Sequence, residues 1–150
     1  MKNIVSCLLA LAVVGLVLGE VYGGQLEYEL SVAAMEGDVD KVRALLKKGA
    51  DPNFQNGRGM TVLIEAAGEG LEPVVKALLE HGAKVNLQDK RGMTALMEAA
   101  GKGRLEVAKI LVEKGADVGL KSATGATALA FASVGGHSAV AEFLKSKGAP

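Results

Sequence analysis

A sequence period of 33 residues constrains this 150-residue chain more than any other feature. Four series of residues keep the period in phase: Gly49, Gly82, Gly115 and Gly148, each followed by Ala; Leu45, Leu78, Leu111 and Leu144; Gly37, Gly70, Gly103 and Gly136; and Thr61, Thr94 and Thr127. A fixed period of this length is typical of a structural unit that stacks on copies of itself. The sequence therefore predicts a solenoid in which each repeat packs on its neighbours.

Each copy is predicted to form a turn followed by two short helices. The three phased threonines stand where a helix N-cap belongs, because a Thr hydroxyl can accept a hydrogen bond from a first-turn N–H group. Glu65 and Glu98 follow one turn later, near the positive end of the helix dipole. Gly70 and Gly103 suit the left-handed conformation that ends a helix. The second helix, as in 74–79 and 107–112, carries one apolar stripe on an otherwise charged surface.

The period, together with its Gly-x-Thr-x-Leu, Ala-Ala and Gly-Ala-Asp-x-Asn runs, resembles the ankyrin repeat. Residues 59–67 stand where that family has Gly-x-Thr-Pro-Leu-His-x-Ala-Ala. The resemblance covers about residues 26–150 and implies an all-α repeat solenoid of helix-turn-helix units, each with a β-hairpin-like loop. It implies one domain at 24–150 with repeats at about 26–55, 56–88, 89–121 and 122–150.

Several positions depart from the family pattern. The motif's proline is replaced by Val62, Ala95 and Ala128, and its histidine, which usually bonds to the Thr, is replaced by Ile64, Met97 and Ala130. We therefore expect the first helices to depend on the Thr cap and on stacking. Gly119 stands where the earlier repeats have Asn, so we expect a looser last hairpin. The first repeat lacks the Gly-x-Thr opening and is expected to form a cap, and the last helix has a polar outer face suited to a terminal repeat.

The resemblance implies that a partner binds to the hairpin tips and the inner-helix face. The expected partner-binding residues are Gln55, Arg58, Met60, Glu65, Glu69, Gln88, Lys90, Arg91, Met93, Glu98, Lys102, Lys121 and Thr124, with Gly68, Gly101, Ala126 and Val134 on the same face. Cations gather at the tips and acids on the adjoining helices, which predicts a bipolar groove with adaptable methionine contacts and arginine anchors. Alternatively, the tip charges only keep the hairpins soluble, and Met60 and Met93 pack against the next hairpin.

Residues 1–23 are predicted to be a secretory signal peptide. Lys2 precedes an apolar run from Ile4 to Leu18, which is short for the roughly 20 residues that span a bilayer. Small residues allow cleavage after Gly19 or Gly23. An uncleaved segment that anchors the protein in the membrane is the alternative. Cleavage would remove the single cysteine, Cys7, and leave no disulfide or thiol. We expect a bacterial protein, periplasmic or secreted, with no membrane contact after cleavage.

Composition narrows the function classes. Lys plus Arg total 17 and Asp plus Glu total 17, so the chain lacks the cationic excess of a nucleic-acid binder. Two His and one Cys leave little from which to build a metal site. His81 is predicted at a helix end, His137 in a helix–helix turn, and Asp38 at a helix cap. No phosphate loop, dinucleotide fingerprint or nucleophile elbow occurs.

These observations predict a non-catalytic, exported protein–protein interaction module with no cofactor. We expect a monomer that binds a protein partner, without nucleic acid or metal. Two alternatives fit the same sequence: an inhibitor or immunity protein for a secreted enzyme or toxin, and an effector delivered into another cell.

Overall fold

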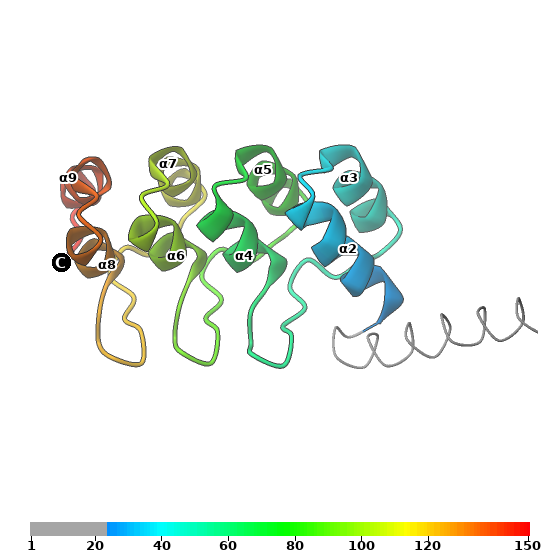
Figure 1. The fold of residues 1–150 in the computed structure, drawn as a ribbon, viewed down its shortest axis with the longest axis horizontal. Helices are drawn as coiled ribbons and strands as arrows, with labels where there is room; N and C mark the ends of the chain where they lie inside the picture. Colours follow the sequence, from blue (N-terminus) through cyan, green and yellow to red (C-terminus); the bar gives the residue numbers. More distant parts are fainter. Residues whose placement is uncertain (1–23) are drawn as a thin grey trace, which may run out of the picture.

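Residues 24–150 are described by a computed structural model; the predicted signal peptide lies outside this range. Within it the chain forms eight helices and no strand. They pair as α2 (Gln25–Met35) with α3 (Val39–Lys47), α4 (Val62–Glu69) with α5 (Glu72–Glu80), α6 (Ala95–Gly101) with α7 (Leu105–Glu113), and α8 (Ala128–Val134) with α9 (Ser138–Ser146). The pairs stack in a row, with α2, α4, α6 and α8 in one layer and the other helices in a second (Figure 1). The predicted all-α repeat solenoid is confirmed.

The phased threonines cap the inner helices as the sequence predicts. Thr61 Oγ1 accepts a hydrogen bond from Ile64 N at 3.2 Å, and Thr94 Oγ1 accepts one from Met97 N at 3.2 Å. The third threonine repeats the contact to Ala130 N at 3.4 Å. All three threonines are buried. The helices therefore begin at these caps although the motif's proline and histidine are absent.

Gly70 ends α4 in the left-handed conformation, with φ 74°. Its N–H donates to Ala67 O, and Leu71 N donates to Ala66 O, which satisfies the last carbonyls of the helix. A Cβ at position 70 would lie 2.9 Å from Arg104 Cδ of the next repeat. Arg104 Nε also donates to Gly68 O at 3.0 Å, so the end of α4 is tied to its neighbour.

The phased leucines form the core between the two layers. Leu45, Leu78, Leu111 and Leu144 are 3%, 0%, 0% and 0% exposed, and they lie on the outer helices α3, α5, α7 and α9. Inner-helix residues such as Leu63 and Leu96 are equally buried and meet them from the other layer. The hydrophobic core thus runs along the row of repeats, and each interior repeat contributes to two interfaces. Among residues 24–150, no helix is long and apolar enough to cross a membrane.

Asparagine side chains join the loops that follow the outer helices of consecutive repeats. Asn53 Nδ2 donates to Gly82 O at 3.1 Å, and Asn53 Oδ1 accepts from Lys84 N at 2.7 Å. Asn86 makes the same two bonds to residues 115 and 117, at 3.3 and 2.8 Å. These side chains hold the register between repeats.

Gly119 occupies the next position in the asparagine series. The residue corresponding to Lys84 is then Pro150, which has no N–H to donate, so an Asn at 119 would have no matching donor there. Gly119 N still donates to Asp117 Oδ1 at 2.8 Å, as Asn53 N does to Asp51. The local turn is therefore kept. Gly119 lacks only the side chain that, at Asn53 and Asn86, bonds to the next repeat.

Candidate functional site

The three hairpin-tip loops, 55–60, 88–93 and 121–126, share one construction. In the middle loop Asp89 N donates to Met93 O at 3.0 Å and Gly92 N to Asp89 O at 2.9 Å. Adjacent tips are joined by backbone bonds, from Lys90 N to Arg58 O at 3.1 Å and from Ala123 N to Arg91 O at 2.8 Å. This close approach fixes the spacing of the tips along the solenoid.

A buried carboxylate, Asp89, holds the middle tip together, and sequence reasoning did not identify it. It is 6% exposed, and Asp89 Oδ1 accepts from Arg91 N at 2.8 Å and from Met93 N at 2.9 Å. The Arg91 guanidinium donates twice to Asp89 Oδ2, at 3.0 and 2.8 Å. Burial alone would raise the pKa of Asp89, but the hydrogen bonds from Met93 and Arg91 outweigh it and lower that pKa.

The position of Asp89 carried a signal in the sequence. Asn56 and Ser122 stand 33 residues before and after it, and all three side chains can accept a hydrogen bond in a turn. Asn56 Oδ1 accepts from Arg58 N and Met60 N, and Ser122 Oγ accepts from Ala126 N. This series was detectable from the period alone.

Gln55 and Gln88 fasten the tips, although the sequence placed them among the partner-binding residues. Gln55 Nε2 donates to Gly59 O at 2.8 Å and to Gln88 O at 2.9 Å. Gln88 Nε2 repeats the pattern to Gly92 O at 2.8 Å and to Lys121 O at 2.9 Å. Each amide nitrogen bonds within its own loop and to the next, while both glutamines are exposed, so their expected contact with a partner stays a prediction.

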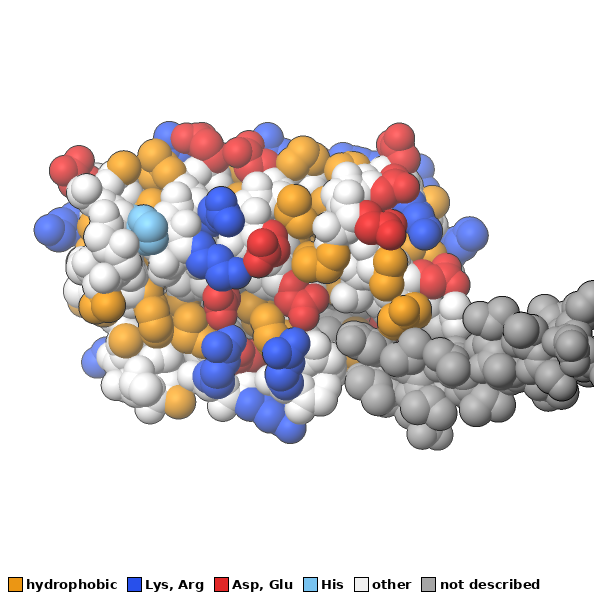
Figure 2. All heavy atoms as spheres, in the orientation of Figure 1, with side chains coloured by type: hydrophobic (Ala, Val, Ile, Leu, Met, Phe, Trp, Pro, Cys, Tyr) orange, Lys and Arg blue, Asp and Glu red, His pale blue; other side chains and the backbone are white. Residues whose placement is uncertain are grey.

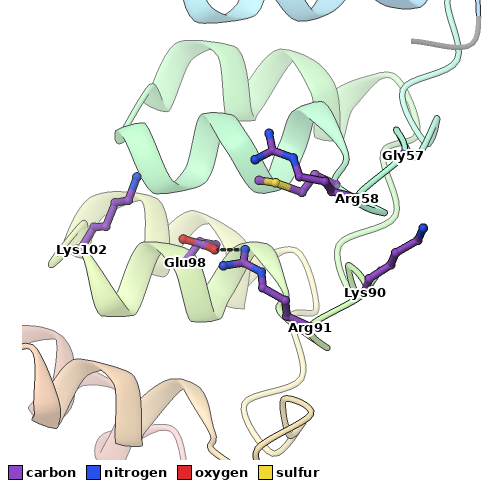
Figure 3. Close-up of a pocket in the computed structure, with 7 residues that line it drawn as sticks. Gly57, Arg58, Lys90, Arg91, Glu98 and Lys102 are labelled. Atoms are coloured by element: carbon purple, nitrogen blue, oxygen red, sulfur yellow. Dashed lines mark hydrogen bonds and ion pairs between the residues drawn. The ribbon is translucent and has the colours of Figure 1, made fainter. Parts of the chain in front are cut away.

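A groove of about 520 Å³ opens between the tips and the helices α4 and α6 (Figure 3). It is lined by Gly57, Arg58, Met60, Lys90, Arg91, Glu98 and Lys102. A second hollow of about 220 Å³ continues it toward α2, sharing Met60, Glu98 and Lys102 and adding Met35, Ile64, Glu65, Gly68 and Glu69. Figure 2 shows Lys and Arg side chains over the tips and exposed hydrophobic side chains between the tips and the helices.

Two of the groove's cations are paired with carboxylates. Arg91 Nη2 lies 2.9 Å from Glu98 Oε1, in addition to its bonds with Asp89, and these contacts raise the pKa of Arg91. Lys102 Nζ lies 2.7 Å from Glu69 Oε1 across the repeat boundary, and this hydrogen bond lowers the pKa of Glu69. Arg58 and Lys90 are different: within residues 24–150 their side chains form no hydrogen bond or ion pair.

Glu65 lies half-buried beside the groove. Burial raises the pKa of Glu65, while the positive charge of Arg58 and a 3.5 Å contact from Ser31 Oγ act in the opposite direction. The net result is a raised pKa, because burial disfavours the charged form. Glu65 is thus a weak counter-charge to Arg58 and forms no ion pair with it.

The remaining predicted residues divide between core and surface. Met93 is 8% exposed and packs against the core, but it also lines the hollow beside the last tip; Met60 is half-buried and lines the groove. Thr124 lines a further hollow of about 500 Å³ with Lys90, Arg91 and Phe131, whereas Lys121 lines none of the described hollows around the tips. Half-buried Ala126 lies in the last tip.

Four inner-helix positions in one register shape the floor. They are Met35, Gly68, Gly101 and Val134. The two end residues are exposed, at 41% and 91%, while a Cβ at Gly68 would lie 3.3 Å from Lys102 Nζ. Gly68 and Gly101 therefore place no side chain in the middle of this series, whereas Met35 and Val134 expose apolar side chains at its two ends.

The histidines and Asp38 occupy structural positions. His81 Nδ1 lies 2.8 Å from Ala77 O at the end of α5, and His137 Nε2 lies 3.0 Å from Gly101 O of the preceding repeat. Asp38 caps α3 by accepting from Lys41 N at 3.0 Å. Among residues 24–150, no group of His, Cys, Asp or Glu has a geometry that could hold a metal ion.

The structure defines a helical-repeat solenoid with a groove beside its hairpin tips. A family model of ankyrin repeats, with three copies, matches residues 30–122, and the chain belongs to the ankyrin-repeat family. Ankyrin repeats are generally protein–protein interaction modules and are typically non-catalytic. A comparison with curated proteins finds no match for the chain.

Proposed function

We propose that this protein is a non-catalytic module that binds a partner protein in the groove between the hairpin tips and the helices α4 and α6. The observation that carries the proposal is the pair of cations, Arg58 and Lys90, that form no ion pair among residues 24–150 and line the groove together with the apolar Met60. Arginine and methionine are enriched at protein interfaces, where Met adapts to irregular partner shapes.

The rigidity of the tips supports the proposal. Each tip is closed by its own turn and joined to the next through backbone bonds and glutamine side chains. A surface that is already ordered loses little conformational entropy when it binds. The groove therefore needs little rearrangement to bind a partner of complementary shape.

A paired charge reversal tests the binding face. Arg58→Glu with Lys90→Glu should abolish capture of the native partner while leaving helicity unchanged, since both side chains are exposed and make no contacts that the fold needs. Arg91→Glu is avoided, because it would bring a carboxylate against Asp89 and Glu98. The matched control reverses two exposed cations on outer helices, Lys41→Glu with Lys76→Glu. Capture by the groove variant equal to that by the control would contradict the proposal.

We propose further that residues 1–23 direct export and that the mature protein is periplasmic or secreted in a bacterium. Support comes from Lys2, the apolar run after it and the small residues at 19 and 23. Cell fractionation followed by mass measurement should find an exported chain that begins at Glu20 or Gly24. A full-length chain in the cytoplasm would contradict export, and a full-length chain in the membrane fraction would support the anchored alternative.

A further inference from the structure

We infer that the groove binds an acidic, extended peptide segment of the partner, with carboxylates paired to Arg58 and Lys90 and a nearby apolar side chain on Met60. This inference rests on the proposed function and adds the chemistry of the partner. It follows from the charge balance of the groove, its shape and the composition of its lining.

Two of the four cations that line the groove form no ion pair, so carboxylates of a partner can pair with them. The lining contains four cations and one carboxylate, Glu98. Arg91 is neutralised by Glu98 and Asp89, at 2.9 and 2.8 Å, and Lys102 by Glu69 at 2.7 Å. Arg58 and Lys90 have no such partner among residues 24–150, and Glu65, which faces Arg58, forms no ion pair with it. Complementary charge on a partner would speed encounter and fix its register in the groove.

The shape of the groove favours an extended chain over a folded surface element. The two hollows share Met60, Glu98 and Lys102 and so adjoin each other from the tips toward α2. The second hollow is lined by Glu65, Glu69 and Glu98, so the acidic residues of the bound segment lie at the tips and not in this hollow. An extended peptide advances about 3.3 Å per residue, whereas neighbouring helices pack about 8–10 Å apart. A segment of about six residues would therefore cover two repeats.

The spacing of the unpaired cations is fixed by the backbone. Lys90 N donates to Arg58 O at 3.1 Å, so the two residues come from adjacent tips that cannot separate without breaking this bond. In Figure 3 the side chains of Arg58 and Lys90 extend from neighbouring tips, and Met60 lines the same groove. Carboxylates close to one apolar residue would pair with these two cations while the apolar side chain contacts Met60.

The lining disfavours nucleic acid as the occupant. The groove contains no aromatic side chain on which a base could stack. Two unpaired cations on a chain of zero net charge would release few phosphate counterions. An acidic peptide needs only the two cations and the apolar floor.

Selection from a peptide library tests the inference directly. The full chain is immobilised and panned against displayed random peptides of about 12 residues, long enough to cross the groove when extended. Enriched sequences should carry at least two Asp or Glu residues close to a Leu, Ile, Met or Phe. A synthetic peptide of the enriched sequence, followed by fluorescence anisotropy, should bind about 10-fold or more weakly to the Arg58→Glu, Lys90→Glu variant, and binding should weaken as salt is added.

Two controls make the selection decisive. The Lys41→Glu, Lys76→Glu variant should bind the acidic peptide as the unchanged protein does, and circular dichroism should show equal helicity in all three proteins. A peptide whose Asp and Glu are replaced by Lys should regain affinity for the Arg58→Glu, Lys90→Glu variant.

Three results would overturn the inference: no enriched peptide, enrichment without an acidic bias, or acidic peptides that bind equally to the groove variant. A native partner that depends on the groove but presents no acidic segment would leave the proposed function standing and reject this chemistry.

Discussion

At the residue scale, the least expected feature is the buried Asp89 carboxylate. It satisfies two backbone N–H groups of its loop and orients Arg91 toward Glu98. Its lowered pKa means that its contribution to stability is present above the unfolded-state pKa and is lost as the pH falls through the folded-state pKa. Asp89 is therefore charged in the folded protein at neutral pH.

Substitutions at Asp89 separate its acceptor role from its charge. Asp89→Ala should lower the free energy of unfolding by about 1–3 kcal/mol, because the buried Met93 N–H and the part-buried Arg91 N–H lose their acceptor. Asp89→Asn should cost less, since Asn56 performs the same acceptor role in the preceding repeat. Urea unfolding monitored by circular dichroism measures both. If the Ala variant is as stable as the Asn variant, the acceptor role is wrong.

Glu65 predicts the opposite dependence on pH. Because its folded-state pKa is raised from 4.5, the charged form destabilises the fold, and stability is lost as the pH rises through that range. Glu65→Gln should therefore be more stable than the unchanged protein at neutral pH, and the difference should shrink at pH values below the unfolded-state pKa. Melting temperatures of both proteins across this range provide the comparison. A difference that grows as the pH falls would contradict the account.

The sequence predicted the local role of a residue better than it predicted how far that residue is buried. The Thr caps, the helix-end position of His81 and the cap at Asp38 depend on neighbours within a few residues, and all were predicted. Met93 and the glutamines depend on the adjacent repeat. Met60 and Met93 share a register and each lines a hollow between adjacent tips, but Met60 is half-buried and Met93 is only 8% exposed. The sequence period does not show how much of each copy the neighbouring side chains cover.

At the element scale, the hairpin tips act as one connected strip. Gly92 has φ 72°, and a Cβ there would lie 2.7 Å from Ala123 N, the atom that bonds to Arg91 O. Gly125 has nearly the same conformation, φ 80°, but no atom lies within 4 Å of its added Cβ. The two positions therefore share backbone strain and differ in contact with a neighbouring tip.

This difference gives a matched pair of variants. Gly125→Ala should cost about 1–2 kcal/mol for the left-handed conformation alone. Gly92→Ala should cost more, because it also displaces the next tip, and hydrogen exchange at the Ala123 amide should accelerate only in this variant. Equal stability of the two variants, with unchanged exchange at Ala123, would show that the tips are not coupled.

The elements themselves were largely predictable from the period. Both helices of each repeat follow from apolar spacing and glycine positions, which are local signals. For the groove, the sequence predicted only the face of the solenoid on which it lies. Its volume and its ion pairs depend on which side chains of adjacent tips contact each other. The pairing of Lys102 with Glu69 and of Arg91 with Glu98, which leaves Arg58 and Lys90 unpaired, is visible only in three dimensions.

At the scale of the whole molecule, stability depends on interfaces between neighbouring repeats. Leu78→Ala or Leu111→Ala should lower the free energy of unfolding by about 2–5 kcal/mol and broaden the thermal transition, since each lies in a repeat with neighbours on both sides. Leu144→Ala, in the last described repeat, should have a smaller effect on cooperativity. An unchanged melting curve for Leu78→Ala would contradict this packing.

The central claim, that a partner protein occupies the groove beside the hairpin tips, is tested most directly by site-specific photocrosslinking in the native cell. Gly57 lines the groove, is exposed and has no atom within 4 Å of an added Cβ, so it can accept a photoreactive side chain. Lys76 on α5 is the matched exposed position away from the groove. The account predicts a discrete crosslinked protein from position 57, lost in the Arg58→Glu, Lys90→Glu background, and none from position 76. A partner that crosslinks from position 76 and not from position 57 would contradict it.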